Sequence, residues 1–195
     1  FILKKVQKID LDIISKIHSS EYLNFLISTE KIKKQEIIPD VHSFDKRIPY
    51  YDLPPELAAG YFSFDDGAPF TKHTWESALY SASAAYNAAK DLIISKKNTY
   101  ALCRPPGHHA TKSQAGGFCY LNNAAIAAEA LIEVNKNKVL IVDIDFHHGN
   151  GTQHIFYERS DIYYLSLHGN TDKNYPFYSG RIQETGINEG KVFNK

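Results

Sequence analysis

The chain has 195 residues, of which 43% are apolar and 23% charged, a composition that can bury the core of one domain. Lys and Arg together number 22, as do Asp and Glu, so no overall positive charge would attract nucleic acid or an anionic membrane. No stretch approaches the roughly 20 apolar residues that span a bilayer, and the N-terminus has no signal-peptide pattern. We therefore expect a cytoplasmic protein that binds neither nucleic acid directly nor a membrane.

The first half of the chain alternates helical patterns with a long irregular stretch. Apolar residues at helical spacing predict a helix within residues 20–35, behind the capping candidates Ser19 and Ser20. Residues 36–73 are rich in Pro, Asp and Gly, which predicts an irregular surface loop. Residues 74–97 are Ala-rich and predict a long helix.

The second half alternates short apolar runs with helical patterns. Strands are predicted over residues 100–103, 139–144 and 162–167, and helices over residues 122–134 and 152–157. The run at 139–144, VLIVDI, is unbroken and β-branched, which is typical of a buried strand. This order predicts an α/β domain with a parallel sheet and helices on its faces.

A first chemical cluster lies in the sequence VLIVDIDFHHGNG, residues 139–151. Asp143, Asp145 and His147 occupy alternate positions, so they would project to the same side if the strand continued. They would then lie at the carboxyl end of a strand, where open α/β sheets bind ligands. Oxygen and nitrogen ligands at this spacing suit Zn²⁺ or a similar divalent ion. The alternative is a set of polar strand-end residues that face water.

A second cluster is the histidine pair in RPPGHHA. His108 and His109 follow two prolines that restrict the backbone of their loop. Near a metal, one histidine can take a proton from water while the other protonates the leaving group. Each ring needs an orienting partner, for which Asp143 and Asn150 are candidates. Taken alone, such a pair would be read as surface decoration or core filler.

The third cluster is GGFCYLNN, residues 116–123. Its two glycines permit close backbone approach, and Phe118 and Tyr120 could wall a narrow slot. Taken alone, the segment fits a helix entrance with core aromatics equally well.

Together, RPPGHHA, GGFCYLNN and VDIDFHHGNG resemble the histone deacetylase superfamily. The segments YFSFDDGAPFTKHTWESAL and SLHGNTDKNYPFYSG are more similar to its acetylpolyamine amidohydrolase branch and class II-like relatives. Asn150 agrees with that branch, since the class I pattern has Asp there. The resemblance implies the arginase–deacetylase fold, a parallel sheet sandwiched between helical layers, with residues 1–195 as a single, incomplete catalytic domain.

The resemblance also implies roles for individual residues. Asp145 and His147 would bind one zinc ion. His108, backed by Asp143, and His109, backed by Asn150, would be the catalytic imidazoles. A structural potassium ion would be held by a set at the ends of two strands: Asp143, Asp145, His147, Ser166 and Leu167.

The same resemblance implies a narrow tunnel for an acylated amine. Gly117, Phe118 and Tyr175 would line it, with the two aromatic rings as its walls. For a polyamine substrate, acidic residues at the rim would help, and Asp65 and Asp66 are candidates, although they also fit ordinary loop acids.

The activity implied is a zinc-dependent amidohydrolase that removes acetyl groups from acetylated polyamines or similar small acylated amines. The alternatives are a protein acetyl-lysine deacetylase, a non-catalytic relative that binds acyl-lysine or a partner, and an arginase-like ureohydrolase with two manganese ions. A homo-oligomer is compatible with each of them. The third zinc ligand, an Asp, and the Tyr or His that supports the oxyanion lie downstream in the family pattern. We therefore expect residues 1–195 alone to bind zinc poorly and to have little activity.

Overall fold

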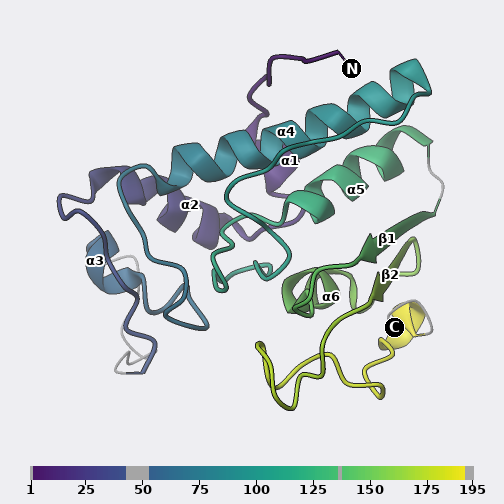
Figure 1. Cartoon of the computed structure of the whole chain (residues 1–195). Helices are drawn as coiled ribbons and strands as arrows, with labels where there is room; N and C mark the ends of the chain where they lie inside the picture. The colour runs from purple at the N-terminus through teal and green to yellow at the C-terminus, as the bar shows by residue number, and fades with distance from the viewer. Residues whose placement is uncertain (1, 43–52, 136–137, 192–195) are drawn as a thin grey trace.

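The computed structural model describes residues 2–42, 53–135 and 138–191 (Figure 1). The long helix α4 (Thr74–Ser95) runs along one side of the molecule, and α5 (Asn123–Asn135) lies between it and the strands. The other elements are α1 (Leu11–Ile14), α2 (Ser20–Ser28), η1 (Thr29–Lys31), α3 (Pro55–Ala58), β1 (Val139–Asp143), α6 (Asn150–Phe156), β2 (Ile162–Ser166) and η3 (Asn188–Gly190).

Strands β1 and β2 are parallel, with α6 as the crossover between them, as the sequence predicts. Their register runs from Val139 opposite Ile162 to Asp143 opposite Ser166. The prediction of a third strand at residues 100–103 is wrong, because within the described part of the chain this segment has no partner strand. Tyr100 and Leu102 are 85% and 83% exposed, so these two side chains do not pack in a core.

The two faces of this sheet have different surroundings. On one face Ile162 and Tyr164 are buried beneath the helices, whereas on the other Leu140 is 57% and Val142 is 49% exposed. The prediction of a buried strand therefore holds for one face of β1. A helical layer over the second face, as the expected sandwich requires, is not among the described residues.

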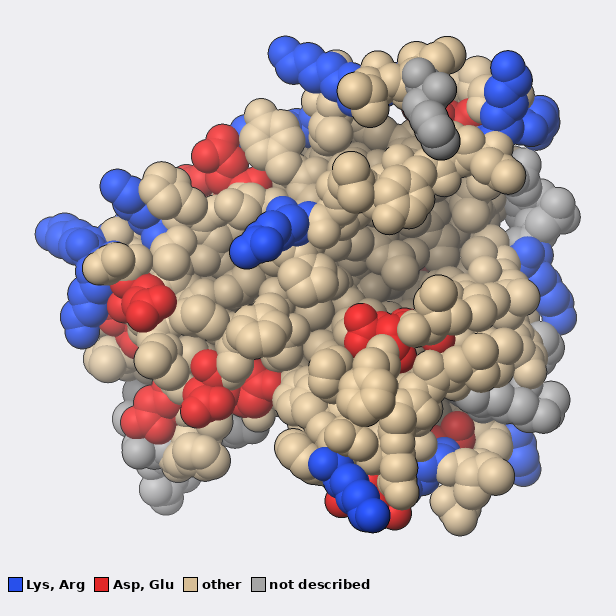
Figure 2. Space-filling model, viewed as in Figure 1, with Lys and Arg blue, Asp and Glu red and all other residues tan. Residues whose placement is uncertain are grey.

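Helix α4 packs on α5 through small side chains, because Ala78, Ala82, Ala85 and Ala89 are buried along one side of it. Helix α2 begins as predicted, since Oγ of Ser19 accepts a hydrogen bond from the amide of Tyr22 at 3.3 Å. None of the described helices combines the length and apolarity needed to cross a bilayer. On the face in Figure 2, most lysine and arginine side chains lie near the outline, and both acidic and uncharged residues lie between them.

The stretch predicted as a surface loop, residues 36–73, contributes to the core instead, apart from residues 43–52, which lie outside the described residues. Phe62 and Phe70 are buried, and their rings lie 4.6 and 5.1 Å from that of Phe25 on α2. The described part of the stretch also contains the short helix α3, which the prediction of an irregular loop missed. Its aromatic side chains bury apolar surface although most of the segment is irregular.

Candidate active site

His108 is held by the carboxylate at the end of β1. Its Nδ1 donates to Oδ2 of Asp143 at 2.9 Å, and the hydroxyl of Tyr164 on β2 donates to the same oxygen, also at 2.9 Å. Burial opposes ionisation of Asp143, but these hydrogen bonds, the charge of His108 and the amide of Asp145 outweigh it and lower the pKa of Asp143. The His108 ring is thereby oriented with its Nε2 4.0 Å from Oδ1 of Asp145.

His109 has an uncharged partner instead. Its Nδ1 donates to Oδ1 of Asn150, the first residue of α6, at 2.7 Å. Burial, followed by the neighbouring charge of His108, lowers the pKa of His109 to about 4, although the bond to Asn150 acts in the opposite sense. The two imidazole rings lie 4.0 Å apart, so adjacent histidines are placed in different electrostatic surroundings.

Asp145 and His147 come together on a loop, not on a strand. Strand β1 ends at Asp143, so the strand does not continue through Asp145 and His147. Instead, Oδ1 of Asp143 accepts from the amide of Asp145 at 3.1 Å, and Oδ1 of Asp145 accepts from the amide of His147 at 2.8 Å. These two consecutive turns place both side chains on the same side as His108.

The donor atoms of this pair fit one metal ion. Oδ1 of Asp145 and Nδ1 of His147 lie 3.2 Å apart, and Nε2 of His108 lies 4.0 Å from the same carboxylate oxygen. Two ligands of a tetrahedral zinc ion are expected about 3.3 Å apart, from bond lengths of about 2.0 Å. In the described ranges no group of three His, Cys, Asp or Glu side chains forms a complete metal site.

Asp65 ties together the segments predicted to wall the tunnel. Its carboxylate accepts hydrogen bonds from the amide of Gly67, from the amide of Gly117 at 3.0 Å, and from the hydroxyl of Tyr175. The ring of Tyr175 lies 4.8 Å from that of His109, edge to face. Asp65 is therefore half-buried and hydrogen-bonded, whereas Asp66 is exposed.

Gly117 and Phe118 form the other side of this region. A Cβ on Gly117 would lie 2.3 Å from Cδ2 of His109, and the glycine has a φ of +52°, so only glycine fits here. Phe118 is 66% exposed beside it. Tyr120 is not a wall of a slot: it is buried and its hydroxyl donates to the carbonyl of Pro69, so it belongs to the core.

The residues expected to hold potassium meet where β1 and β2 end. The amide of Leu167 donates to the carbonyl of Asp143 at 2.9 Å. The hydroxyl of Ser166 contacts Nδ1 of His168 at 2.8 Å and Nδ1 of His148 at 3.3 Å. This brings the predicted ligands into one region, and potassium itself stays a prediction.

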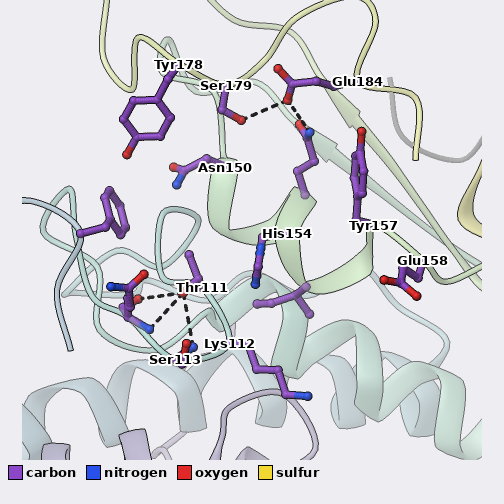
Figure 3. Close-up of a pocket in the computed structure, with 14 residues that line it drawn as sticks. Thr111, Lys112, Ser113, Asn150, His154, Tyr157, Glu158, Tyr178, Ser179 and Glu184 are labelled. Atoms are coloured by element: carbon purple, nitrogen blue, oxygen red, sulfur yellow. Dashed lines mark hydrogen bonds between the residues drawn. The ribbon is translucent and has the colours of Figure 1, made fainter. Parts of the chain in front are cut away.

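An open cavity of about 860 Å³ is lined in part by Asn150 (Figure 3). The loop at residues 111–114, helix α6 and residues 178–184 line it, and the described lining includes neither His108 nor His109. Glu184 accepts from Nε2 of Gln153 on α6 at 2.6 Å and from Ser179 at 3.2 Å. These bonds anchor the loop after Tyr175 to the helix that carries Asn150.

Comparison with known proteins decides the family. The sequence profile of the histone deacetylase domain matches residues 2–195. The chain belongs to the histone deacetylase family. Its parallel sheet with helices is accordingly the arginase–deacetylase architecture, as the motifs predict.

Three proteins similar to this member of the histone deacetylase family carry related names. Acetylpolyamine amidohydrolase 2 of Pseudomonas aeruginosa is 45% identical over 135 residues, which are 69% of this chain and 39% of that protein. Acetylpolyamine amidohydrolase of Mycoplana ramosa is 39% identical over 185 residues, or 92% of this chain and 54% of that protein. A crystal structure of acetylpolyamine aminohydrolase from Burkholderia pseudomallei superposes with a TM-score of 0.89 at 37% identity, covering 100% of this chain and 58% of that one. The chain thus spans about half the length of such relatives, or less.

Sequence reasoning missed two residues at this histone deacetylase-type site, Tyr164 and Gly149. A Cβ on Gly149 would lie 2.3 Å from the Tyr164 hydroxyl and 2.4 Å from Oδ2 of Asp143. A signal for Tyr164 was present, because alternation along residues 162–166 places it on one face with Ser166. The register of β1 against β2, which brings that face beside Asp143, had to come from the structure.

Proposed function

We propose that the full-length protein is a zinc-dependent amidohydrolase that removes acetyl groups from acetylated polyamines or similar small acylated amines. The observation that carries this proposal is the pairing of two adjacent histidines with unlike partners, His108 with a carboxylate and His109 with an amide, beside Asp145 and His147. The similarity to acetylpolyamine amidohydrolases supports the substrate class.

Asp145 and His147 would hold the zinc ion together with an Asp from elsewhere in the full-length protein. Bound zinc supplies a Lewis acid that polarises the amide carbonyl and acidifies water. The side chains of this chain would accept and donate the protons of the reaction. His109 has a pKa of about 4 and its Nδ1–H donates to Asn150, so its Nε2 is an uncharged acceptor for the proton of water.

His108 is suited to the opposite role. The carboxylate of Asp143 stabilises a positive charge on the imidazole, which an amide such as Asn150 does not. A protonated His108 would donate from Nε2 to the leaving amine, so that acetate and the free amine are the products. The ring of Tyr175 beside His109 and the exposed ring of Phe118 would hold the alkyl chain of the substrate.

The test is an assay of the full-length, zinc-loaded protein on acetylputrescine and acetylcadaverine, with an acetyl-lysine peptide in parallel. We expect acetate release from the acetylated diamines, and loss of that activity in both His108→Ala and Asp145→Ala. Preference for the peptide would favour the second candidate, protein deacetylation, which the name of the family supports. Bound zinc without acetate release from any of them would contradict the amidohydrolase and favour a binding role.

Potassium at the ends of β1 and β2, assembly into a homo-oligomer and a cytoplasmic location are further parts of this proposal. Each has its own measurement. The potassium dependence of the melting temperature tests the potassium site, the molar mass from light scattering tests the oligomer, and cell fractionation tests the location. None of these affects the assignment of the reaction.

A further inference from the structure

Tyr164 lies inside the molecule at the back of the His108–Asp143 pair. Its side chain is 1% exposed and comes from β2, where it lies opposite Ile141 and therefore diagonally beside Asp143 on the same face of the sheet. Its hydroxyl donates to Oδ2 of Asp143 at 2.9 Å, the oxygen that also accepts from Nδ1 of His108 at 2.9 Å.

The carboxylate of Asp143 is consequently held from three directions. Oδ1 accepts from the amide of Asp145 at 3.1 Å, while Oδ2 accepts from both His108 and Tyr164. A carboxylate oxygen has about two lone-pair sites, so these two donors satisfy Oδ2. Rotation of the Asp143 carboxylate would break these bonds. The orientation of the His108 ring therefore depends on the orientation of the carboxylate.

Gly149 packs closely against this arrangement. A Cβ at this position would lie 2.3 Å from the hydroxyl oxygen of Tyr164, 2.4 Å from Oδ2 of Asp143 and 3.1 Å from Nδ1 of His108. The backbone of the loop before α6 therefore closes over all three groups at once. Little room is left for another group to replace the tyrosine hydroxyl.

We propose that Tyr164 is a positioning residue for the reaction: its hydroxyl fixes the Asp143 carboxylate and, through it, the ring of His108. The inference rests on the proposed function, because it assigns Tyr164 to the proton transfers of that site. Tyr164 is 1% exposed and is none of the predicted zinc ligands, so its removal should affect turnover and leave substrate binding unchanged.

The test compares Tyr164→Phe with Tyr22→Phe in the full-length, zinc-loaded protein. Tyr22 is a matched control, because it too is fully buried and its hydroxyl donates one hydrogen bond, to the carbonyl of Tyr120 at 2.8 Å, within the core. Both substitutions keep the ring and remove one buried hydroxyl. We expect a similar small fall in melting temperature and unchanged zinc content for both.

The expected difference is in turnover. Tyr164→Phe should lower kcat about tenfold, the scale of a partly misplaced acid–base group, with KM within about twofold of the original. Tyr22→Phe should leave both constants unchanged. In an Asp143→Asn background, Tyr164→Phe should have no further effect, because the two residues act through one contact.

A second measurement is independent of activity. The Nδ1 proton of His108 should give a strongly downfield proton resonance that moves in Tyr164→Phe and stays in place in Tyr22→Phe. An unchanged kcat in Tyr164→Phe, or equal losses in both variants, would overturn the positioning role. If the unmodified protein releases no acetate, the proposed function fails, and an unmoved His108 resonance would then overturn the positioning role separately.

Discussion

Around α2, side chains are held by packing, whereas at the ends of β1 and β2 they are held by hydrogen bonds. Phe25, Phe62 and Phe70 are buried against one another in an aromatic cluster. Asp143, Asp145 and His147 depend instead on turns and on ring nitrogens, and the outer face of the strands beside them is exposed. The first region supplies burial of apolar surface, and the second supplies hydrogen-bonded polar groups that can do chemistry. Changes in the two regions should therefore affect different measurements.

The largest effect is expected from Asp145→Ala. The side chain is 51% exposed, so its removal should leave the free energy of unfolding of the metal-free protein nearly unchanged. Zinc binding should weaken, and kcat/KM should fall on the order of 10³-fold or more, since a Lewis acid contributes several kcal/mol. Metal analysis, chemical denaturation and acetate release check this. A loss of stability equal to the loss of activity would contradict the separation of the two regions.

The reciprocal change is Phe62→Ala in the aromatic cluster. Phe62 is buried, and its ring stacks on that of Phe25 at 4.6 Å. Removing such a ring from a core costs about 3–5 kcal/mol of unfolding free energy. Denaturant titration should show this loss, while kcat measured well below the melting temperature stays within about twofold of the original. A variant that is folded but inactive would show that the cluster shapes the site directly.

A smaller effect is expected on the stability of the protein in acid, through His18. This residue lies just before α2 and contacts Asn122. It is fully buried, its Nε2 accepts from the amide of Asn122 at 2.9 Å, and burial lowers its pKa from 6.5 to about 4. The unfolded chain therefore binds more protons between these values. The stabilising contribution is present above pH 6.5 and is lost as the pH falls toward 4, reaching roughly 3 kcal/mol in total.

His18→Gln retains an acceptor for Asn122 and removes the titration. Between pH 7 and pH 5, the metal-free protein should lose about 2 kcal/mol more unfolding free energy with histidine than with glutamine. Urea titrations at the two pH values measure this difference. Equal losses in both proteins would show that His18 is not responsible for acid sensitivity.

The smallest effect separates the two candidate rim acids. Asp65 accepts from Gly67, Gly117 and Tyr175, so Asp65→Asn should misplace the tunnel walls and lower kcat/KM about fivefold to tenfold. Asp66 is exposed, and Asp66→Asn should change kcat/KM by less than about twofold. Steady-state kinetics on acetylputrescine decide between them. A selective rise of KM in Asp66→Asn would assign substrate recognition to that residue.

The sequence predicted the site better than it predicted the surroundings of the site. His108 and His109 have the hydrogen-bond partners that the resemblance to the histone deacetylase superfamily implies, Asp143 and Asn150 respectively. The strand at residues 100–103 failed, since an apolar run does not specify which strand it pairs with. The role of residues 36–73 in the core was missed, because Pro and Gly hide the periodicity on which burial is predicted.

Local pattern by itself determined the helices α2, α4, α5 and α6 and the two paired strands, because each depends on neighbours within a few residues. It also identified the side chains that carry charge or metal-binding atoms. The tertiary structure decided everything that depends on register and close approach. The turns that carry Asp145 and His147 past the end of β1, the Tyr164 hydroxyl on Asp143 and the carboxylate of Asp65 on Tyr175 are such features. Each joins atoms whose distance is set by how β1, β2 and the loops pack, and a linear sequence does not contain that distance.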